Sequence, residues 1–391
     1  MEKSLDADLI IAGAGPAGLS LAATLSDAPL RILIVERTPL CDLAKPKFDG
    51  REIALTHASV RRLKSLRVWD RIAACDIAPL ERARVLNGQS PFALQFKNPH
   101  TNETLGALVS NAAIRRALFE VVAAQDNCTI LADHAVVSLD AGKNHVVAAV
   151  SGDLRVKAKL AVAADTRFSP LRQAQGISAR LIDFGRTMLV CRLWHSTPHD
   201  GVATEWFGHG QTIAMLPLQE GVSSYVLTLP SHEIEPLVEL SPEAFAADAM
   251  KRTQGRWGRM ELASTRHAYP LVAVYADRFF SARFALVGDA AVGMHPVTAH
   301  GYNFGLSGAC RLATELRRSA TRGGDIGRVD GLRRYERTHR RATWPLFAAT
   351  NVLAKLYSDE RAPMRLARGA GLRLMQAASP ARHMLEARLT A

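Results

Sequence analysis

The chain has 391 residues, 48% of them hydrophobic and 22% charged, the composition of a folded protein with a sizeable core in one large domain or two intertwined ones. No apolar run approaches the ~20 residues that a membrane-spanning helix needs. The first expected strand also follows the N-terminus too closely to leave room for a signal peptide. The cysteines are scattered and form no C-x-x-C motif, which argues against a disulfide framework or a structural zinc site and favours a reducing compartment. We therefore expect a cytoplasmic protein, or one that lies against the inner face of a membrane without crossing it.

The net charge of +12 is concentrated late in the chain, between Arg311 and Arg388. No nucleic-acid recognition motif and no basic strip interleaved with aromatic residues accompanies this charge, so we expect no nucleic-acid partner. Two interpretations of the basic C-terminal stretch stay open. It is either a solvated helical face or a surface attracted to anionic lipid headgroups, and the mixture of arginine with Leu and Met over residues 361–376 suits both.

The strongest local pattern lies within the first 36 residues. The apolar run Leu9–Ala12 predicts a buried parallel strand because it shows no polar alternation. Gly13, Gly15 and Gly18 follow at G-x-G-x-x-G spacing, apolar residues then recur at helical spacing, and a second apolar run ends at Glu36. This strand–turn–helix–strand order predicts a dinucleotide site. The alternative is a glycine-rich turn within an ordinary α/β domain.

Each part of this pattern has a physical role in binding a dinucleotide. Gly13 permits the tight turn, Gly15 lets a pyrophosphate approach the backbone, and Gly18 lets the helix pack closely on the strand. The helix N-terminus offers unpaired N–H groups and the positive end of its dipole to that anion. The Glu36 carboxylate is placed to accept hydrogen bonds from the ribose hydroxyls of an adenosine.

The next part of the chain alternates between loops, short strands and helices. Residues 38–50 read as a loop that leads to Arg51, which could reach a phosphate or the edge of a flavin or form an ordinary surface ion pair. Helical spacing runs from Ser59 to Trp69, short strands are expected from 77 to 108, and Ser110-Asn111 should cap a helix over 112–124. Further strands are expected at 129–131, 135–139, 145–150 and 159–164.

A β-rich insert is expected from about residue 177 to 269, with strands at 187–193, 213–216 and 223–229 and a helix opening at Ser241-Pro242. The chain should then rejoin the first layer with a buried strand at 284–287, followed by a helix at 303–318. The remainder reads as basic and helical, with breaks near Gly323-Gly324, Pro345, Pro363 and Pro380.

Two more motifs complete the glycine fingerprint, although they lie far from it in the sequence. The second is Ala164-Asp165-Thr166-Arg167-Phe168-Ser169-Pro170-Leu171-Arg172, and the third runs from Phe284 to Leu306 and includes Gly288-Asp289, His295-Pro296 and Gly301-Tyr302-Asn303. With these motifs the chain resembles the class A FAD-dependent aromatic hydroxylases of the p-hydroxybenzoate hydroxylase type. Within them it is most similar to the ubiquinone-biosynthesis UbiH/UbiF/VisC family, including its UbiM type.

The resemblance covers nearly the whole chain and implies an α/β fold: a Rossmann-type FAD-binding domain with an inserted β-sheet substrate domain and a helical C-terminus. Residues 1–76, 110–176 and 271–345 would form the FAD-binding domain, 77–109 and 177–270 the substrate domain, and 346–391 the C-terminal helical segment. Within the substrate domain we expect the pocket to be lined from among Trp194, Trp206, Phe207 and Met215, with a plain core role as the alternative.

The resemblance also implies an activity. An FAD-dependent monooxygenase of this type uses O2 and NAD(P)H, or another reductant, to form a flavin C4a-hydroperoxide that hydroxylates the aromatic ring of a prenylated ubiquinone precursor. NAD(P)H would be a transient electron donor, since no second glycine fingerprint exists. A ubiquinone-biosynthesis complex and peripheral membrane contact are implied partners. The alternatives are a hydroxylase of a small soluble phenol, a related flavoprotein such as an isoprenoid reductase, and a non-catalytic flavin-binding subunit.

The same resemblance assigns site residues. Pro296 would sit beside the flavin ring, and His295 and His300 are candidate catalytic residues that could tune protonation or serve as structural hydrogen-bonding groups. No metal site is expected. The positions matched to FAD contacts are Gly13, Gly15, Pro16, Ala17, Gly18, Glu36, Arg37, Arg51, Asn111, Asp165, Asp289, Gly301, Tyr302 and Asn303.

Four positions depart from the family pattern. Thr166 stands where the second motif usually has glycine, so a turn that would use glycine's freedom must suit a β-branched residue. Val292 replaces a histidine, Ala299-His300-Gly301 replaces Gly-Gln-Gly, and Gly308 replaces an aspartate. These changes mark a divergent subgroup.

Overall fold

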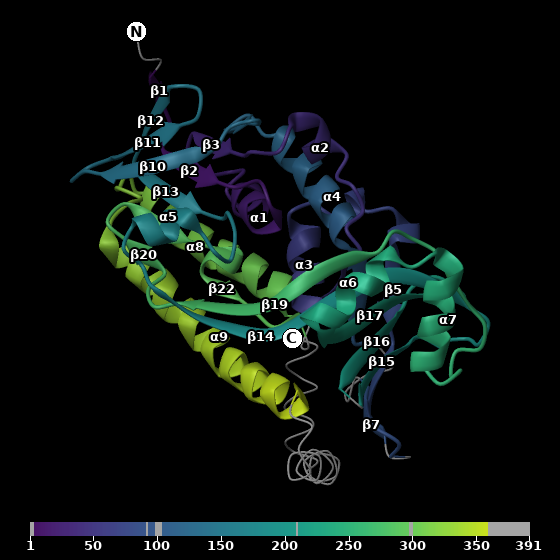
Figure 1. Ribbon diagram of the computed structural model, residues 1–391. Coiled ribbons are helices and arrows are strands. Elements are labelled where there is room, and N and C mark those ends of the chain that lie inside the picture. The colour runs from purple at the N-terminus through teal and green to yellow at the C-terminus, as the bar shows by residue number, and fades with distance from the viewer. Residues whose placement is uncertain (1–3, 91–92, 98–103, 209, 297–299, 359–391) are drawn as a thin grey trace.

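The computed structural model describes residues 4–90, 93–97, 104–208, 210–296 and 300–358. A six-stranded sheet forms its central layer, with an antiparallel edge strand beside five parallel strands (Figure 1). In spatial order the strands are β20 (Phe280–Ser281), β21 (Phe284–Leu286), β13 (Leu160–Ala163), β2 (Leu9–Ala12), β3 (Ile32–Val35) and β9 (Cys128–Leu131). The short strands β2, β3 and β13 consist of apolar residues and are buried throughout, as expected of parallel strands covered on both faces.

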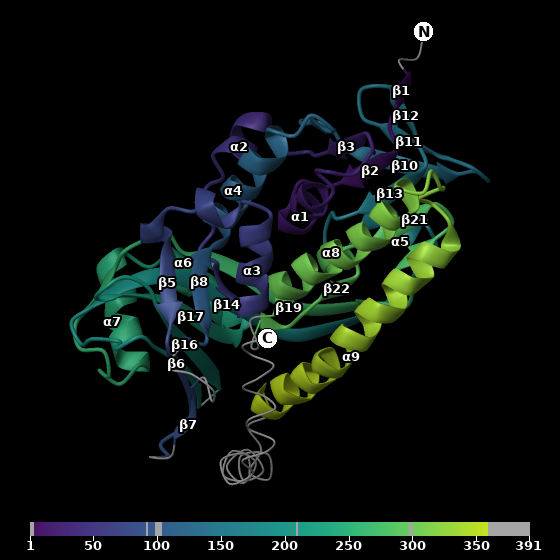
Figure 2. The ribbon, with the colours of Figure 1, turned by 180° about the vertical axis from the view of Figure 1, so that it is seen from behind.

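Helices cover one side of this layer (Figure 1). α1 (Pro16–Thr24) packs against α8 (Gly301–Ala320) and against α4 (Asn111–Ala123), and α9 (Val329–Ser358) runs alongside α8 (Figure 2). The Ser110 hydroxyl caps α4 by accepting from the Ala113 N–H, as the sequence predicts. Shorter helical segments are α2 (Leu40–Ala44), α3 (His57–Ser65), η1 (Trp69–Arg71), η2 (Ala74–Asp76), α5 (Pro170–Ala174) and η3 (Gly288–Ala290).

Two small sheets flank the central layer. One is four-stranded, in the order β1 (Ser4–Asp6), β12 (Leu154–Ala158), β11 (Val146–Val150) and β10 (Val136–Ala141). The other is three-stranded, in the order β4 (Glu52–Leu55), β8 (Gly106–Ser110) and β5 (Ile77–Leu80). The strands expected between residues 77 and 108 are therefore confirmed, but they divide between this sheet and the large sheet described next.

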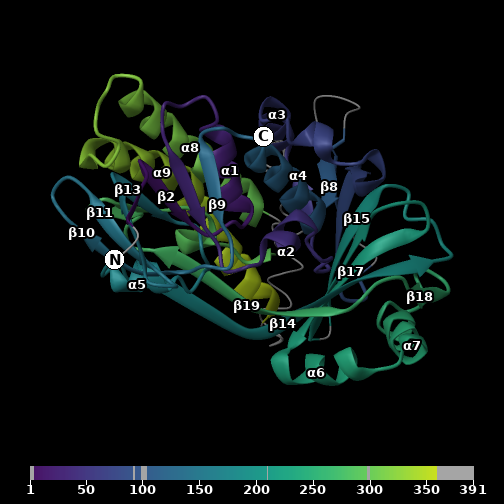
Figure 3. The same ribbon diagram turned by 90° about the horizontal axis from the view of Figure 1, so that it is seen from above.

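The largest sheet has nine strands and forms the second half of the molecule. β14 is 17 residues long and runs from the central layer into this sheet beside β19 (Figure 3). In spatial order the strands are β22 (Val292–Gly293), β19 (His267–Ala276), β14 (Ala179–His195), β17 (Val222–Pro230), β16 (Gln211–Pro217), β15 (Val202–Gly208), β6 (Arg82–Asn87) and β7 (Ala93–Phe96), with β18 (Met260–Leu262) paired to β14.

One face of the large sheet packs on α6 (Ser231–Glu239) and α7 (Pro242–Arg252) and encloses a second hydrophobic core. Alternate residues of β14, β16 and β17 point into this core, including Leu189, Tyr225 and Leu227, none of which has exposed surface. The opposite face looks toward β4: Arg192 on β14 forms an ion pair with Glu52, with 2.6 Å between Nη2 and Oε1. The large sheet thus contacts the three-stranded sheet that contains β4 along that face.

Two expected boundaries are wrong. Helix α3 ends at Ser65 rather than Trp69, because Arg67 adopts φ +56° in the left-handed region. The expected break at Pro345 does not occur, since α9 continues through it. A proline inside a helix removes one hydrogen bond, but Tyr335 and Phe347 are fully buried on either side of it, and that packing holds the helix together. Pro363 and Pro380 lie outside the described residues.

Within the described residues, no helix combines the length and apolar composition that crossing a bilayer requires. The segment expected to interact with a membrane lies largely beyond residue 358.

The tight contact between α1 and β2 yields a stability prediction. A Cβ added at Gly18 would lie 2.0 Å from the Gly13 carbonyl oxygen, a backbone atom that cannot move aside cheaply. We expect Gly18→Ala to lower the free energy of unfolding of the ligand-free protein by about 1–3 kcal/mol. Urea unfolding followed by circular dichroism measures the effect. Gly331→Ala is the matched control, because the nearest atom to its Cβ is 3.8 Å away and unfolding should stay unchanged or become harder. Equal stability of the two variants would contradict the prediction.

Candidate functional site

Two helix N-termini face a common region of the molecule. Gly15 is the N-cap of α1 and Gly301 is the first residue of α8. Helix α1 packs on α8, and a Cβ at Gly288 would lie 2.6 Å from the Cβ of Ala17, so η3 also abuts the start of α1. Two sets of unpaired backbone N–H groups and two positive dipole ends are thereby brought into one part of the fold.

Gly15 and Gly301 share a property that packing does not explain. An added Cβ would meet no atom within 4 Å at either position, and neither residue has φ in the left-handed region. Among the described glycines whose φ lies outside the left-handed region, these are the two at which an added Cβ would have no neighbour within 4 Å. Open space at two helix N-termini suits an anionic ligand that approaches the backbone closely.

Glu36 lies beside the first of these N-termini, at the end of β3. Its carboxylate accepts hydrogen bonds from the Ala14 N–H, with N···O 2.6 Å, and from the backbone and hydroxyl of Thr38. Oε1 accepts both bonds from Thr38, whereas Oε2 accepts only from Ala14 and keeps a lone pair for a further donor. Glu36 is therefore fixed next to the glycine turn and can still bind a ligand hydroxyl. The neighbouring Arg37 is exposed.

Asp165 is the acidic residue of the second motif and sits at the end of β13. Its Oδ2 accepts from the Ser169 hydroxyl at 3.0 Å, whereas its Oδ1 is buried without a partner among the described residues. Burial raises the pKa of this carboxyl above its ordinary value, against the lowering effect of the Ser169 hydrogen bond. A buried acceptor without a partner costs stability unless a ligand supplies the donor.

The second and third motifs are joined through two arginines. The buried Arg172 donates through Nη1 to the carbonyl oxygens of Arg167 and Ala290, and Arg167 forms an ion pair with Asp289 in which Nη2 and Oδ2 lie 3.0 Å apart. Asp165 and Asp289, 124 positions apart in the chain, therefore belong to one constellation (289 − 165).

Arg51 belongs to a compact polar cluster on the other side of the site. Its guanidinium donates to the Asp49 carboxylate through Nε at 3.1 Å and Nη2 at 2.6 Å and lies over the ring of Tyr269. Asn111 donates to the same carboxylate at 2.8 Å, and the Tyr269 hydroxyl donates to the Asp49 carbonyl oxygen. Burial would raise the pKa of Asp49, but the Arg51 hydrogen bonds and charge outweigh it and hold the pKa below its ordinary value.

The sequence predicts Arg51 and Asn111 but misses Asp49 and Tyr269. Asp49 carries no local signal beyond its place two residues before Arg51, and Tyr269 reaches the cluster only because β19 lies against it.

Tyr302 and Asn303 anchor the start of α8. The Tyr302 hydroxyl lies 3.1 Å from Ser20 Oγ on α1, and Asn303 accepts from the Thr56 N–H and donates to the Ala54 carbonyl oxygen in β4. Burial raises the pKa of the Tyr302 hydroxyl. These side chains hold α8 against α1 and β4, so a ligand there would meet the backbone N–H groups of the helix.

The three catalytic candidates differ in environment. Pro296 is exposed, His300 is buried at the N-cap of α8, and the His295 ring packs edge-on against Phe184 with 4.6 Å between centroids. Burial lowers the pKa of His295 to about 4, so its imidazole is neutral at physiological pH. His295 therefore contributes an uncharged aromatic ring to the candidate site.

The departures from the family pattern have local explanations in two cases. A Cβ at Gly308 would lie 2.8 Å from the His339 imidazole, so a side chain there would displace the histidine. Val292 is buried in β22, where it pairs with Tyr275. Thr166 precedes the turn capped by Ser169, and its backbone carbonyl accepts from the Ser169 N–H. Nothing in the structure explains why glycine is absent there.

The expected lining of the substrate pocket needs correction. Trp206 and Met215 point into the core beneath α6 and α7. Side chains alternate along each strand, and these two occupy the positions that face away from β4. Phe207 lies on the face toward β4, and Trp194 is 38% exposed near the outer end of β14.

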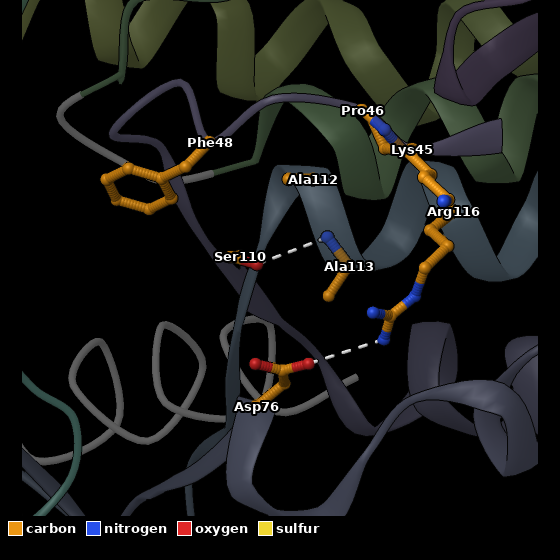
Figure 4. Close-up of a pocket in the computed structure, with 8 residues that line it drawn as sticks. All are labelled: Lys45, Pro46, Phe48, Asp76, Ser110, Ala112, Ala113 and Arg116. Carbon is orange, nitrogen blue, oxygen red and sulfur yellow. Dashed lines mark hydrogen bonds and ion pairs between the residues drawn. The ribbon is translucent and has the colours of Figure 1, made fainter. Parts of the chain in front are cut away.

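A separate cavity of about 290 Å³ lies between the loop after α2 and the start of α4 (Figure 4). Arg116 and Asp76 form an ion pair across it, with 3.4 Å between Nη2 and Oδ2. None of the residues that the sequence assigns to the cofactor lines this cavity, so the converging motifs and not the cavity define the candidate site. The cavity is lined by Lys45, Pro46, Phe48, Asp76, Ser110, Ala112, Ala113 and Arg116.

The described residues bring no three His, Cys, Asp or Glu side chains together as a metal site.

Comparison with known proteins agrees with this constellation. The model of the FAD binding domain family matches residues 6–350. The chain is 43% identical to the ubiquinone hydroxylase UbiM of Neisseria meningitidis over 99% of this chain and 85% of that protein. It is 31% identical to the ubiquinone hydroxylase UbiL of Rhodospirillum rubrum over 97% of this chain and 88% of that protein.

Solved structures match in fold. PqsL, a probable FAD-dependent monooxygenase from Pseudomonas aeruginosa, superposes with a TM-score of 0.78 at 17% identity over 94% of this chain and 99% of its own. The p-nitrophenol 4-monooxygenase PnpA of Pseudomonas putida superposes with a TM-score of 0.77 at 17% identity over 100% of this chain and 99% of its own. The expected α/β architecture with an FAD-binding layer and a β-sheet second layer is therefore confirmed.

The two unexplained glycines lead to a binding prediction. We expect Gly15→Ala and Gly301→Ala to leave the unfolding free energy of the ligand-free protein within about 1 kcal/mol of the wild type, because the added methyl meets no protein atom and only the N-cap preference at Gly15 is lost. We expect each to weaken FAD binding by roughly tenfold or more, because the methyl occupies space needed by the ligand. Quenching of FAD fluorescence on titration with ligand-free protein measures affinity. Unchanged FAD affinity in both variants would show that the open space serves something else.

Proposed function

Since the chain belongs to the FAD binding domain family, and within it to the ubiquinone hydroxylases, which are FAD-dependent monooxygenases, we propose that it hydroxylates the aromatic ring of a prenylated ubiquinone precursor. O2 is the oxygen source and NAD(P)H the transient electron donor. The observation that carries this proposal is the 43% identity to a ubiquinone hydroxylase across nearly the whole chain. The mitochondrial ubiquinone biosynthesis monooxygenase COQ6 of Homo sapiens also matches 97% of this chain, at 27% identity.

The residues at the converging motifs fit FAD, and we assign them to its parts. The N-terminus of α1 at Gly15, with Pro16 and Ala17, would receive the pyrophosphate, and Glu36 would accept from the adenosine ribose. Asp289 would bind the ribityl chain, and the N-terminus of α8 at Gly301 would face the pyrimidine end of the flavin. The partnerless Oδ1 of Asp165 and the open space at the two glycines support this fit. Arg37, Arg51 and Asn111 complete the proposed set.

Bound FAD, once reduced, supplies the electrons that activate O2. The chain contributes electrostatics and exclusion of water. The positive end of the α8 dipole stabilises negative charge on a reduced flavin, and the neutral His295 and Pro296 present a weakly polar surface where the ring would lie. Arg51, held by Asp49 and Tyr269, supplies a fixed positive charge. No protein nucleophile is needed.

We also propose a cytoplasmic protein that contacts the inner face of a membrane, where a prenylated substrate would reside, and that joins a ubiquinone-biosynthesis complex. The exposed side chains of Trp344 and Val352 on the basic helix α9 support such a contact. Residues 359–391, which carry more of the basic charge, lie outside the described residues.

A direct test uses the FAD-loaded protein with a 2-prenylated phenol, O2 and NADH or NADPH. We expect reductant-dependent oxygen consumption and a product that is one oxygen atom heavier by mass spectrometry. The phenol without its prenyl chain is the control for substrate class, and Gly15→Ala is the control for FAD dependence. A product heavier by two hydrogen atoms would identify a reductase instead. FAD binding without any turnover would favour a non-catalytic subunit.

A further inference from the structure

Glu205 is a carboxyl that the proposed FAD site does not use. It lies in the middle of β15, where its neighbours Thr204 and Trp206 point into the core beneath α6 and α7. Because side chains alternate along a strand, Glu205 points to the opposite face of the sheet. It is half-buried, burial alone raises its pKa to about 8, and no described residue gives it a hydrogen bond or an ion pair.

The sheet register connects Glu205 to the candidate site. A row of neighbouring residues crosses five strands on the same face: Glu205, Ala214, Val226, Val190 and His267. At its far end, a Cβ on Gly50 would lie 2.6 Å from Val190 Cγ2 and 3.0 Å from His267 Cδ2, so the row ends against the segment that carries Asp49 and Arg51. Figure 3 shows α6 and α7 on one side of these strands and β8 with α4 on the other.

A second row runs beside the first and ends at the Arg51 cluster. It consists of Phe207, Thr212, Thr228, Met188 and Tyr269. Most members of the two rows keep accessible surface, whereas the alternating residues that face α6 and α7, such as Leu189 and Ile213, are buried. The face therefore stays accessible where the opposite face is sealed. Its alkyl, hydroxyl and aromatic groups suit an aromatic ring with a hydrocarbon tail.

Tyr269 and His267, two polar residues of the rows, already have hydrogen-bond partners. Tyr269 donates to the Asp49 carbonyl oxygen, and His267 Nε2 lies 2.9 Å from the Thr265 hydroxyl. Arg192, on the same face one row away, is paired with Glu52. Glu205 is thus the one carboxyl in these rows, and a carboxyl in such surroundings costs stability unless a ligand provides its partner.

We propose that Glu205 determines substrate specificity by hydrogen-bonding the ring hydroxyl of the phenolic substrate, which lies on the face formed by the two rows. This inference rests on the proposed function, because it takes the substrate to be a phenol. The Glu205 side chain orients the ring through one polar contact, and the alkyl surface of the two rows is left for the prenyl tail.

The test compares a phenol with its methyl ether, which cannot donate a hydrogen bond. The FAD-loaded wild type is titrated with 2-(3-methylbut-2-enyl)phenol and with the corresponding anisole, and the change in flavin absorbance gives both dissociation constants. We expect the wild type to prefer the phenol by about tenfold. We expect Glu205→Met to bind both ligands alike, and Glu205→Gln, which keeps an acceptor, to retain part of the preference.

A thermal-unfolding readout separates this role from a structural one. Removal of a partnerless carboxyl should leave the melting temperature of the ligand-free Glu205→Met protein unchanged or raised, whereas a structural role predicts a lower one. Glu261→Met is the matched control, since Glu261 lies on β18 of the same sheet but is exposed and paired with Arg259. It should keep the full preference for the phenol.

The outcomes distinguish the two proposals. If the wild type prefers the phenol and Glu205→Met and Glu205→Gln keep that preference in full, the assignment of Glu205 is wrong and the proposed function stands. If the FAD-loaded wild type shows no response to the prenylated phenol, the proposed function fails and the Glu205 assignment fails with it.

Discussion

The close approach of backbone to backbone around α1 sets the geometry on which the rest of the site depends. Gly18 sits so near the Gly13 carbonyl oxygen that no side chain fits, and Gly13 itself lies against the Ala164 carbonyl oxygen at the end of β13. Gly288 extends the same contact to η3 through Ala17. Three segments from distant parts of the chain are thereby held at contact distance by glycines, before any polar interaction is considered.

Polar links then fix the second layer against the first. Arg172 joins the second motif to η3, Asn303 joins α8 to β4, and Glu52 joins β4 to Arg192 on the large sheet. Burial raises the pKa of Glu52 even though Arg192 pulls it down, so desolvation of this carboxyl outweighs its partner. Such a pair adds little to stability and instead sets how the two sheets are aligned. The link lies on the face of the large sheet that also carries Glu205.

The sequence predicts those parts of the fold that depend on residues close together in the chain. The run from Leu9 to Glu36 and the cap at Ser110 follow from hydrophobic spacing and from short-range hydrogen bonding, and the structure confirms both. The helical path through Pro345 could not be predicted, because it depends on the burial of Tyr335 and Phe347 against distant segments. The same holds for the faces to which Trp206 and Met215 point, since period-two alternation leaves open which face of a strand is covered by helices. Asp49 and Tyr269 reach Arg51 only through the packing of β19. Whether the matched positions contact FAD remains a prediction from the resemblance.

Gly15, Gly301, Asp165 and Glu205 have in common that the protein alone gives no reason for them. Alanine would suit the two helix starts at least as well for packing, and an apolar residue would be less costly than Glu205 on its face of the sheet. Packing and backbone conformation set no requirement at the two glycines, and the burial of the two carboxyl groups costs stability. The four positions also divide by chemistry: the open glycines and the carboxylate of the second motif lie at the converging motifs, whereas Glu205 lies across the large sheet from them. The pattern is that of one site with two ligands, an anionic cofactor held by backbone N–H groups and a weakly polar substrate held by a single carboxyl.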